Sequence, residues 1–89
     1  MIISRNPCIC ATELDGEICL FDPDRAEYLN LNSTGSAIWN ILEEPMPFDR
    51  LIKLLVQKYS VDIHQCKDDA SLFIEASVAQ GFLFKDEEQ

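Results

Sequence analysis

Basic residues are scarce in this chain, and their scarcity narrows the choice of partner. The 89 residues include 7 Lys and Arg against 16 Asp and Glu, so the formal net charge is −9. A protein that grips a phosphate backbone needs a basic surface, so this charge argues against nucleic acid as a partner. The excess of acid either favours a cationic or neutral partner, such as a peptide with Lys or Arg, or only keeps a small domain soluble.

Long apolar runs are missing as well. No stretch approaches the ~20 apolar residues that a membrane-spanning helix needs. Residues 1–10 carry Arg5 but lack an apolar segment followed by a small-residue cleavage site, so they do not resemble a signal peptide. We expect one cytoplasmic domain over residues 1–89 with no membrane partner. Its core should span about residues 8–84, with flexible ends at the first few residues and at 85–89.

Glycine and histidine are too few and too scattered to build a reactive centre. Gly16, Gly35 and Gly81 stand apart, so no glycine-rich loop is available to cradle a phosphate. The single histidine, His64, has no nucleophile placed with it by a recognisable motif, and its spacing to cysteine does not fit a zinc site. We expect no catalytic residue, no metal site and no cofactor.

Four cysteines occur without a CxxC pair: Cys8, Cys10, Cys19 and Cys66. Free cysteines of cytosolic proteins are mostly small buried apolar residues, and we expect that role here. The alternatives are a disulfide formed during purification and a reactive thiol at Cys8 or Cys10. A reactive thiol would make this chain a small enzyme.

A hairpin is predicted near the start of the chain. Residues 9–14 and 17–21 flank Asp15-Gly16, which is a strong signal for a two-residue turn. The expected cross-strand pairs are Leu14 with Glu17, Thr12 with Cys19, and Cys10 with Phe21. Neither face of this hairpin is strongly polar, so we expect both faces to be partly covered.

A third strand is predicted after the turn at residues 22–25. Residues 27–31 alternate, with Leu29 and Leu31 on one face and Tyr28 and Asn30 on the other. Meander topology pairs this strand with the second strand on one side only, which leaves its other side as a free edge.

Helices follow the three strands. Asn32 or Ser33 is placed to cap the first helix, and Pro45 ends it. The second helix is expected over residues 48–58. This order predicts an α+β fold that is winged helix-turn-helix-like, with a three-stranded antiparallel N-terminal sheet followed by three helices.

The third helix carries two stripes. Asp62 and Gln65 form a capping-box pattern at its start, and Gly81 ends it. The stripe expected to face the core is Cys66, Ala70, Phe73, Ile74 and Ser77. A weaker second stripe is Asp69, Leu72, Ala76 and Ala79. Such a stripe indicates either a deeply buried helix or a partner-binding one, and periodicity alone favours burial.

The most informative segment is residues 28–39, where an alternating strand passes within a few residues into a helix. A short edge strand joined tightly to a helix makes a groove with unpaired backbone groups on one wall. Such a groove can hold a peptide. Nothing comparable in the sequence can hold a reacting substrate.

The order of these motifs resembles PqqD-like domains over roughly residues 12–84. The motifs are Asp15-Gly16, Leu20-Phe21-Asp22, Tyr28-Leu29-Asn30-Leu31-Asn32, Thr34-Gly35, Ala37-Ile38-Trp39, Val61-Asp62, Asp69, Phe73-Ile74 and Gly81-Phe82-Leu83. Two positions depart from the family pattern. Ser77 stands where leucine is usual, and Pro47 stands where a Ser or Thr cap is usual.

The resemblance implies a non-catalytic recognition element for ribosomally made, modified peptides. Such domains bind the leader segment of a precursor peptide as an added strand and present it to a leader protease or other modifying enzyme. The implied peptide-binding residues are Glu27, Tyr28, Leu29, Asn30, Leu31, Asp68, Asp69, Leu72, Phe73, Glu75 and Ala76. A monomer or weak homodimer is expected.

Two versions of this role stay open, and a third function competes with them. A free-standing chain of this length is similar to the leader-binding protein of lasso-peptide pathways. It is also similar to the chaperone partner of a radical enzyme in cofactor biosynthesis. A winged-helix DNA-binding domain is the third candidate, but its recognition helix would have to be basic, and here it is acidic.

Overall fold

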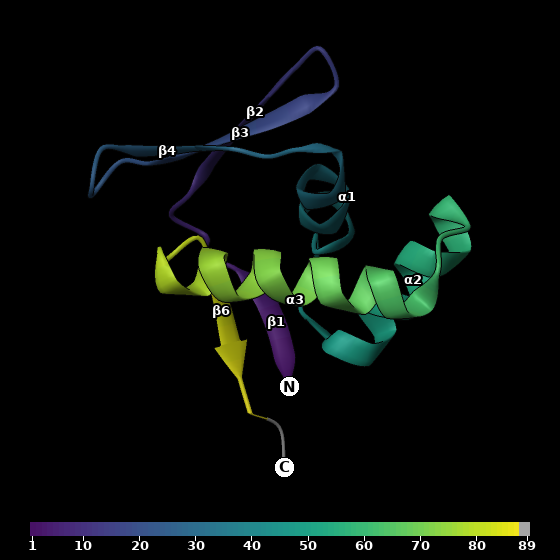
Figure 1. Cartoon of the computed structure of the whole chain (residues 1–89). Coiled ribbons are helices and arrows are strands. Elements are labelled where there is room, and N and C mark those ends of the chain that lie inside the picture. The colour runs from purple at the N-terminus through teal and green to yellow at the C-terminus, as the bar shows by residue number, and fades with distance from the viewer. Residues whose placement is uncertain (88–89) are drawn as a thin grey trace.

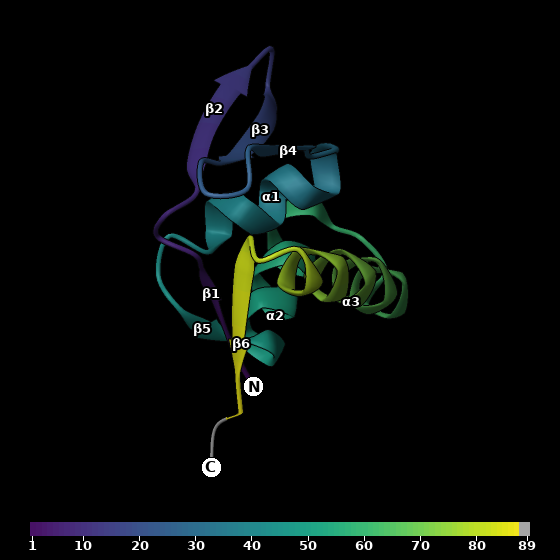
Figure 2. The same ribbon diagram turned by 90° about the vertical axis from the view of Figure 1, so that its left-hand side faces the viewer.

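The computed structural model describes residues 1–87, which form two small sheets and three helices. In chain order the elements are β1 (Ile2–Arg5), β2 (Cys10–Leu14), β3 (Glu17–Asp22), β4 (Glu27–Asn30), α1 (Ser33–Ile41), β5 (Met46–Pro47), α2 (Phe48–Tyr59), α3 (Ile63–Ala79) and β6 (Leu83–Asp86). The sheets have the orders β2-β3-β4 and β5-β1-β6, and every pairing is antiparallel. The helices lie between the two sheets (Figures 1 and 2).

The predicted N-terminal sheet is confirmed in order and register. Leu14 pairs with Glu17, Thr12 with Cys19, and Cys10 with Phe21. Asp15 and Gly16 have φ of 54° and 82°, the left-handed conformation that a two-residue hairpin turn requires. The fold class is therefore α+β with this sheet preceding the helices, as expected.

The second sheet was not predicted. Residues 2–5, for which we predicted flexibility, instead form its central strand, and Ile3 is fully buried. Strand β6 begins at Leu83, and Lys85 and Asp86 extend it where a flexible tail was predicted. The end of that predicted tail, residues 88–89, lies outside the described part of the chain.

The start of α2 depends on this second sheet. Pro47, expected in a linker, lies in β5 and pairs with Ile2. Pro47 is also the N-cap of α2 and supplies no side-chain hydrogen bond. The first N–H of the helix, that of Phe48, donates to the carbonyl of Met1 at 3.0 Å. The N-terminal strand thus satisfies a helix end that lacks a capping side chain.

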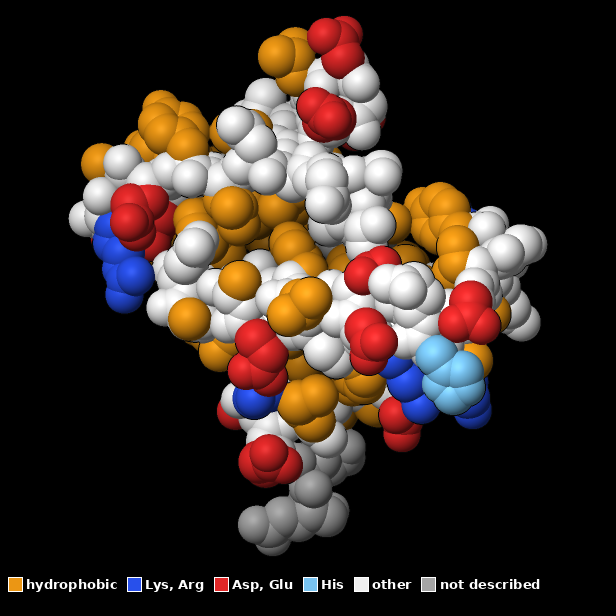
Figure 3. Space-filling view, in the orientation of Figure 1, with side chains coloured by type: hydrophobic (Ala, Val, Ile, Leu, Met, Phe, Trp, Pro, Cys, Tyr) orange, Lys and Arg blue, Asp and Glu red, His pale blue; other side chains and the backbone are white. Residues whose placement is uncertain are grey.

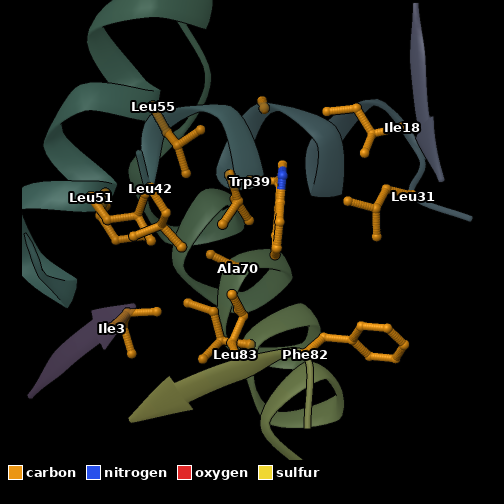
Figure 4. Close-up of a cluster of buried hydrophobic side chains, with 14 of the residues drawn as sticks. Ile3, Ile18, Leu31, Trp39, Leu42, Leu51, Leu55, Ala70, Phe82 and Leu83 are labelled. Atoms are coloured by element: carbon orange, nitrogen blue, oxygen red, sulfur yellow. The ribbon is translucent and has the colours of Figure 1, made fainter. Parts of the chain in front are cut away.

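Side chains from both sheets meet those of the helices in one core (Figure 4). Ile3 and Leu83 point from the second sheet, Ile18 and Leu31 come from the first sheet and its exit, and Leu51 comes from α2. Each fully buried side chain of this size contributes about 1.5–3 kcal/mol. Burial from both ends explains how so small a chain fixes three helices.

Arg5 ties β1 to α1. Its guanidinium lies 4.6 Å from the centroid of the Trp39 ring, and its Nε donates to the Trp39 carbonyl at 3.0 Å. Burial lowers the pKa of Arg5, and the nearby Glu43 carboxylate partly opposes that shift. The contact stabilises a carbonyl of the last turn of α1, where a cation is favourable.

The caps of α1 and α3 are the predicted ones. Asn32 Oδ1 accepts from the Gly35 N–H at 2.8 Å, and Asp62 Oδ2 accepts from the Gln65 N–H at 3.0 Å. The reciprocal half of the predicted capping box is different, since Gln65 Nε2 donates to Asp69 Oδ1 at 3.0 Å. Two backbone N–H groups at helix starts are therefore satisfied locally.

Candidate functional site

One free edge of the first sheet lies on β4, and the other lies on β2. Strand β4 is last in the order β2-β3-β4, and the Leu31 N–H just beyond it donates to the Ile18 carbonyl at 2.8 Å. Antiparallel ladders alternate between residues that bond inward and residues that bond outward. Leu29 therefore bonds toward β3, while the N–H and C=O groups of Tyr28 and Asn30 point away from the sheet.

Ser36 of α1 ends the pairing of this sheet. Its buried hydroxyl accepts from the Ile18 N–H at 3.2 Å and donates to the Leu31 carbonyl at 3.4 Å. The hydroxyl thus occupies a place where a direct bond of the ladder would otherwise form. This bridge fixes the start of α1 against the end of β4, which builds the tight strand-to-helix junction expected from the sequence.

Helix α3 supplies the opposite wall of a groove. Its core stripe is as predicted, with Cys66, Ala70, Ile74 and Ser77 buried and Phe73 half-buried. The second stripe is exposed, and Leu72 leaves 73% of its surface accessible. The burial that periodicity favoured for this stripe is wrong, because no described element covers that side of the helix (Figure 1).

Apolar side chains form the floor of the groove. The space-filling view shows a hollow between β4 and α3 with hydrophobic atoms at its base and carboxylates on the α3 side (Figure 3). Phe73 crosses this floor and packs on Gly35, where a Cβ atom would lie 2.9 Å from Phe73 Cε1. Only glycine allows the ring to approach α1 this closely.

Arg25 closes one end of the groove. It lies in the β3–β4 turn, and its Nη1 donates to the carbonyl of Gln80, the C-cap of α3, at 3.2 Å. The guanidinium also lies 3.9 Å from the position of a Cβ on Gly81. The turn itself is held by the buried Asp22, whose Oδ1 accepts from the Asp24 N–H at 3.0 Å.

A pocket of about 390 Å³ lies at the other end, where the starts of α1 and α3 meet the end of α2. Its lining residues are Ser33, Thr34, Ala37, Leu55, Tyr59, Val61, Asp62, Gln65, Cys66 and Asp69. Burial, with a smaller contribution from the Asp69 carboxylate, raises the pKa of the Cys66 thiol, so this cysteine stays protonated at neutral pH. The pocket therefore combines an apolar interior with an acidic rim.

Sequence reasoning missed most of this pocket. Tyr59, the last residue of α2 and one beyond the predicted end of that helix, has 47% of its surface exposed. Val61 is 44% exposed in the α2–α3 connection. An apolar residue in a short polar connection was the one available signal, since connections of this kind are usually polar.

The structure brings most of the predicted site residues together but separates one. The edge strand, Leu72 and Ala76 border the groove, and Asp69 lies where the groove meets the pocket. Glu75 is directed elsewhere, because its carboxylate contacts Lys85 Nζ of β6 at 3.2 Å. Asp68 is exposed and makes no ion pair among residues 1–87.

The described residues offer few groups that could bind a metal ion or take part in catalysis. They contain no group of three His, Cys, Asp or Glu side chains that could hold a metal ion. His64 is exposed in the first turn of α3. The helices of the described chain are also too short or too polar to cross a membrane.

The cysteines differ from expectation. Cys66 is buried as predicted and Cys19 is partly buried, but Cys8 and Cys10 are exposed. The prediction failed for Cys10 because nothing in the described structure packs over β2, all five of whose residues are exposed, and Cys8 lies in the exposed turn before that strand.

Comparison with known proteins supports the fold assignment. The model of the family described as "Coenzyme PQQ synthesis protein D (PqqD)" matches residues 17–83. A solved structure described as TbiB1 in complex with the TbiA(beta) leader peptide is similar at a TM-score of 0.83 and 24% identity, covering 96% of this chain and 99% of that one. A lasso peptide synthetase B1 complexed with the leader peptide is similar at 0.78 and 20%, covering 93% and 98%. No curated protein sequence matches.

Proposed function

This chain belongs to the PqqD family, and we propose that it is a non-catalytic module that captures the leader segment of a ribosomally made precursor peptide. The two similar solved structures are both complexes with leader peptides, which supports this role. The observation that carries the proposal is the juxtaposition of the free β4 edge with the exposed apolar stripe of α3. We place its action in the cytoplasm, where precursor peptides are made.

The proposed binding mode is strand addition. The outward N–H and C=O groups of Tyr28 and Asn30 offer a leader strand up to four main-chain hydrogen bonds, which require little sequence specificity. Alternate side chains of that strand then face the groove floor near Phe73 or the solvent. The wall formed by Leu72 and Ala76 selects apolar side chains.

The pocket and its rim add a preference at one end of the leader. Its interior fits one apolar side chain, and Asp62 and Asp69 at the rim attract a nearby Lys or Arg. Exposed charge pairs of this kind steer association more than they hold the complex. Arg25 at the opposite end favours an acidic leader residue or the carbonyl end of the strand.

The class of modified peptide that is made depends on the enzyme that receives the leader from this chain. Both similar structures are complexes with a leader peptide, and one of them is described as a lasso peptide synthetase B1. We therefore propose delivery to the leader protease of a lasso-peptide pathway. The family description instead favours a chaperone that serves a radical enzyme in cofactor biosynthesis. The enzyme that forms a complex with this chain and its bound leader distinguishes the two.

A titration with residue-level readout tests the proposal. A labelled leader peptide from the neighbouring precursor gene should bind saturably, whereas a scrambled peptide of the same composition should not. Amide hydrogen exchange should slow at Tyr28 and Asn30 on binding, while Leu29 and Leu31, already bonded to β3, should change little. Absence of binding, or protection confined to other segments, would contradict the proposal.

A further inference from the structure

The outer face of the first sheet is unusually apolar for a surface that no residue among 1–87 covers. The buried side chains of β3, Ile18, Leu20 and Asp22, define the inner face, and the cross-strand pairs then assign the outer one. Its apolar members are Cys10, Leu14, Cys19, Phe21 and Tyr28. An antiparallel sheet with one face on the core normally presents polar residues on the other face.

Two aromatic side chains of this exposed face pack against each other. Tyr28 and Phe21 pair across the strands with ring centroids 4.6 Å apart, although 71% of the tyrosine is accessible. Leu14 at the hairpin tip is 72% accessible. Both ends of the apolar strip are therefore open to solvent, which is typical of a surface that a protein partner covers.

The charges around the face define that partner. Glu17 lies on the outer face opposite Leu14, Asp15 and Asp24 lie in the two turns that flank it, and residues 8–24 contain no Lys or Arg. A complementary surface is therefore apolar with a basic rim. A second copy of this chain, which carries a net charge of −9, and an anionic lipid surface are both repelled by this rim.

We propose that the outer face of β2-β3-β4 docks the enzyme that receives the bound leader. This proposal rests on the proposed function, because a leader strand on β4 would become the fourth strand of the same sheet. An enzyme on this face would contact the sheet and the outward side chains of the leader together. Such a composite surface lets the enzyme distinguish the loaded module from the empty one.

Two adjacent positions on β2 provide a matched test. Thr12 lies on the outer face opposite Cys19, and Ala11 lies on the inner side of the same exposed strand. Thr12→Lys places an ammonium group within the apolar face and against the partner's basic rim. Ala11→Lys adds the same charge to the same strand on the other side.

The measurements are leader affinity by fluorescence anisotropy, and affinity of the leader-loaded chain for the purified processing enzyme encoded beside it. Thr12→Lys should weaken the enzyme complex at least tenfold and leave leader affinity within twofold. Ala11→Lys should leave both within twofold. Equal effects of the two variants on the enzyme complex would overturn the docking proposal.

Thiol labelling gives a second readout that needs no substitution. Alkylation of Cys10 in the wild-type chain should slow at least fivefold when the enzyme is added and remain unchanged with the leader alone. Unchanged Cys10 labelling in the enzyme complex would overturn the proposal. So would a Thr12→Lys variant that still binds the enzyme but no longer forms a homodimer or no longer binds vesicles. Failure of the leader to bind the wild-type chain would instead refute the proposed function.

Discussion

Strands β4 and β6 are both four-residue edge strands of three-stranded antiparallel sheets, but β6 packs against α3 whereas β4 lies across a hollow from it (Figure 3). They differ in what occupies the space between the edge and the helix. At β6, Lys85 reaches Glu75 of α3 at 3.2 Å. At β4, Tyr28 and Asn30 are uncharged, and the one ion pair of the strand among the described residues joins Glu27 to Arg25 of the preceding turn and not to α3.

The two sheets have four edge strands, β2, β4, β5 and β6. The difference between β4 and β6 shows how charge on an edge strand can direct a peptide to one edge and away from another. A lysine on an edge strand discourages strand addition, because the added chain must desolvate or displace its charge. The β4 residues that bond outward carry no charge, and the space beside them ends in a pocket of about 390 Å³. We therefore expect peptide addition at β4 and none at β6.

The largest expected effect comes from removing an outward N–H donor of β4. Removing the matched donor of β6 serves as the control. Asn30→Pro deletes an N–H that points away from β3 and puts a ring at the edge, so leader affinity should fall more than ~100-fold, or roughly 3 kcal/mol. The Asn6 N–H donates to the Phe82 carbonyl at 3.1 Å, so by the same alternation Lys85 bonds outward from β6.

Lys85→Pro is therefore the matched variant, and it should change leader affinity less than twofold. Anisotropy titration gives both affinities, and circular dichroism checks that both variants stay folded. Equal losses in the two variants, with folding intact, would remove the distinction between the edges.

A charge on the helix wall should have the next largest effect. Leu72→Asp should weaken leader binding by about 30-fold, or about 2 kcal/mol, because the bound peptide would desolvate a carboxylate. The fold should be intact, since Leu72 is 73% exposed. Ser71→Asp, an exposed position about 100° away around the helix, is the control and should bind normally. Unchanged affinity of Leu72→Asp would place the peptide elsewhere.

A smaller effect is expected from the groove floor. Gly35→Ala places a Cβ 2.9 Å from Phe73 Cε1, so the ring must move into the groove. We expect about a tenfold loss of affinity, or about 1.4 kcal/mol, measured by the same titration. Phe73→Leu combined with Gly35→Ala should recover part of that loss, since the shorter side chain avoids the contact. An additive double variant would show that the two residues act independently.

The smallest effect on binding is expected from Ser77. Its buried hydroxyl has no hydrogen-bond partner in the described structure. Ser77→Ala removes that unsatisfied group and should stabilise the fold by about 1 kcal/mol, a rise in Tm of roughly 4–8 °C, with leader affinity unchanged. Thermal unfolding measures the first and titration the second. A lower Tm would indicate that the hydroxyl has a partner or fits its site tightly.

The sequence predicted one sheet and missed the other for a definite reason. The β2–β3 register follows from the turn at Asp15-Gly16, which joins strands that are adjacent in the chain. Strand β1 pairs with β6, so Arg5 lies opposite Leu83 with most of the chain between them. No local pattern marks such a pairing, and its four-residue strands are too short to show periodicity.

The candidate site, like the fold, was predicted only where its features are local in the sequence. Both walls were identified, because alternation in β4 and the stripe of α3 are local patterns. The direction of Glu75 toward Lys85 was missed, since it depends on where β6 lies. The pocket around Tyr59 and Val61 was missed for the same reason, because three separate helix ends create it.

The sequence by itself determined the turns, the N-caps of α1 and α3, the strand register of the first sheet and the acidic character of the chain. These features depend on residues a few positions apart, whose geometry is set by local hydrogen bonds and side-chain alternation. The tertiary structure decided that β1 pairs with β6, that the second stripe of α3 is uncovered, and that Gly35 admits the Phe73 ring. Those outcomes depend on packing between distant segments, because a residue's exposure is set by whichever element lies over it.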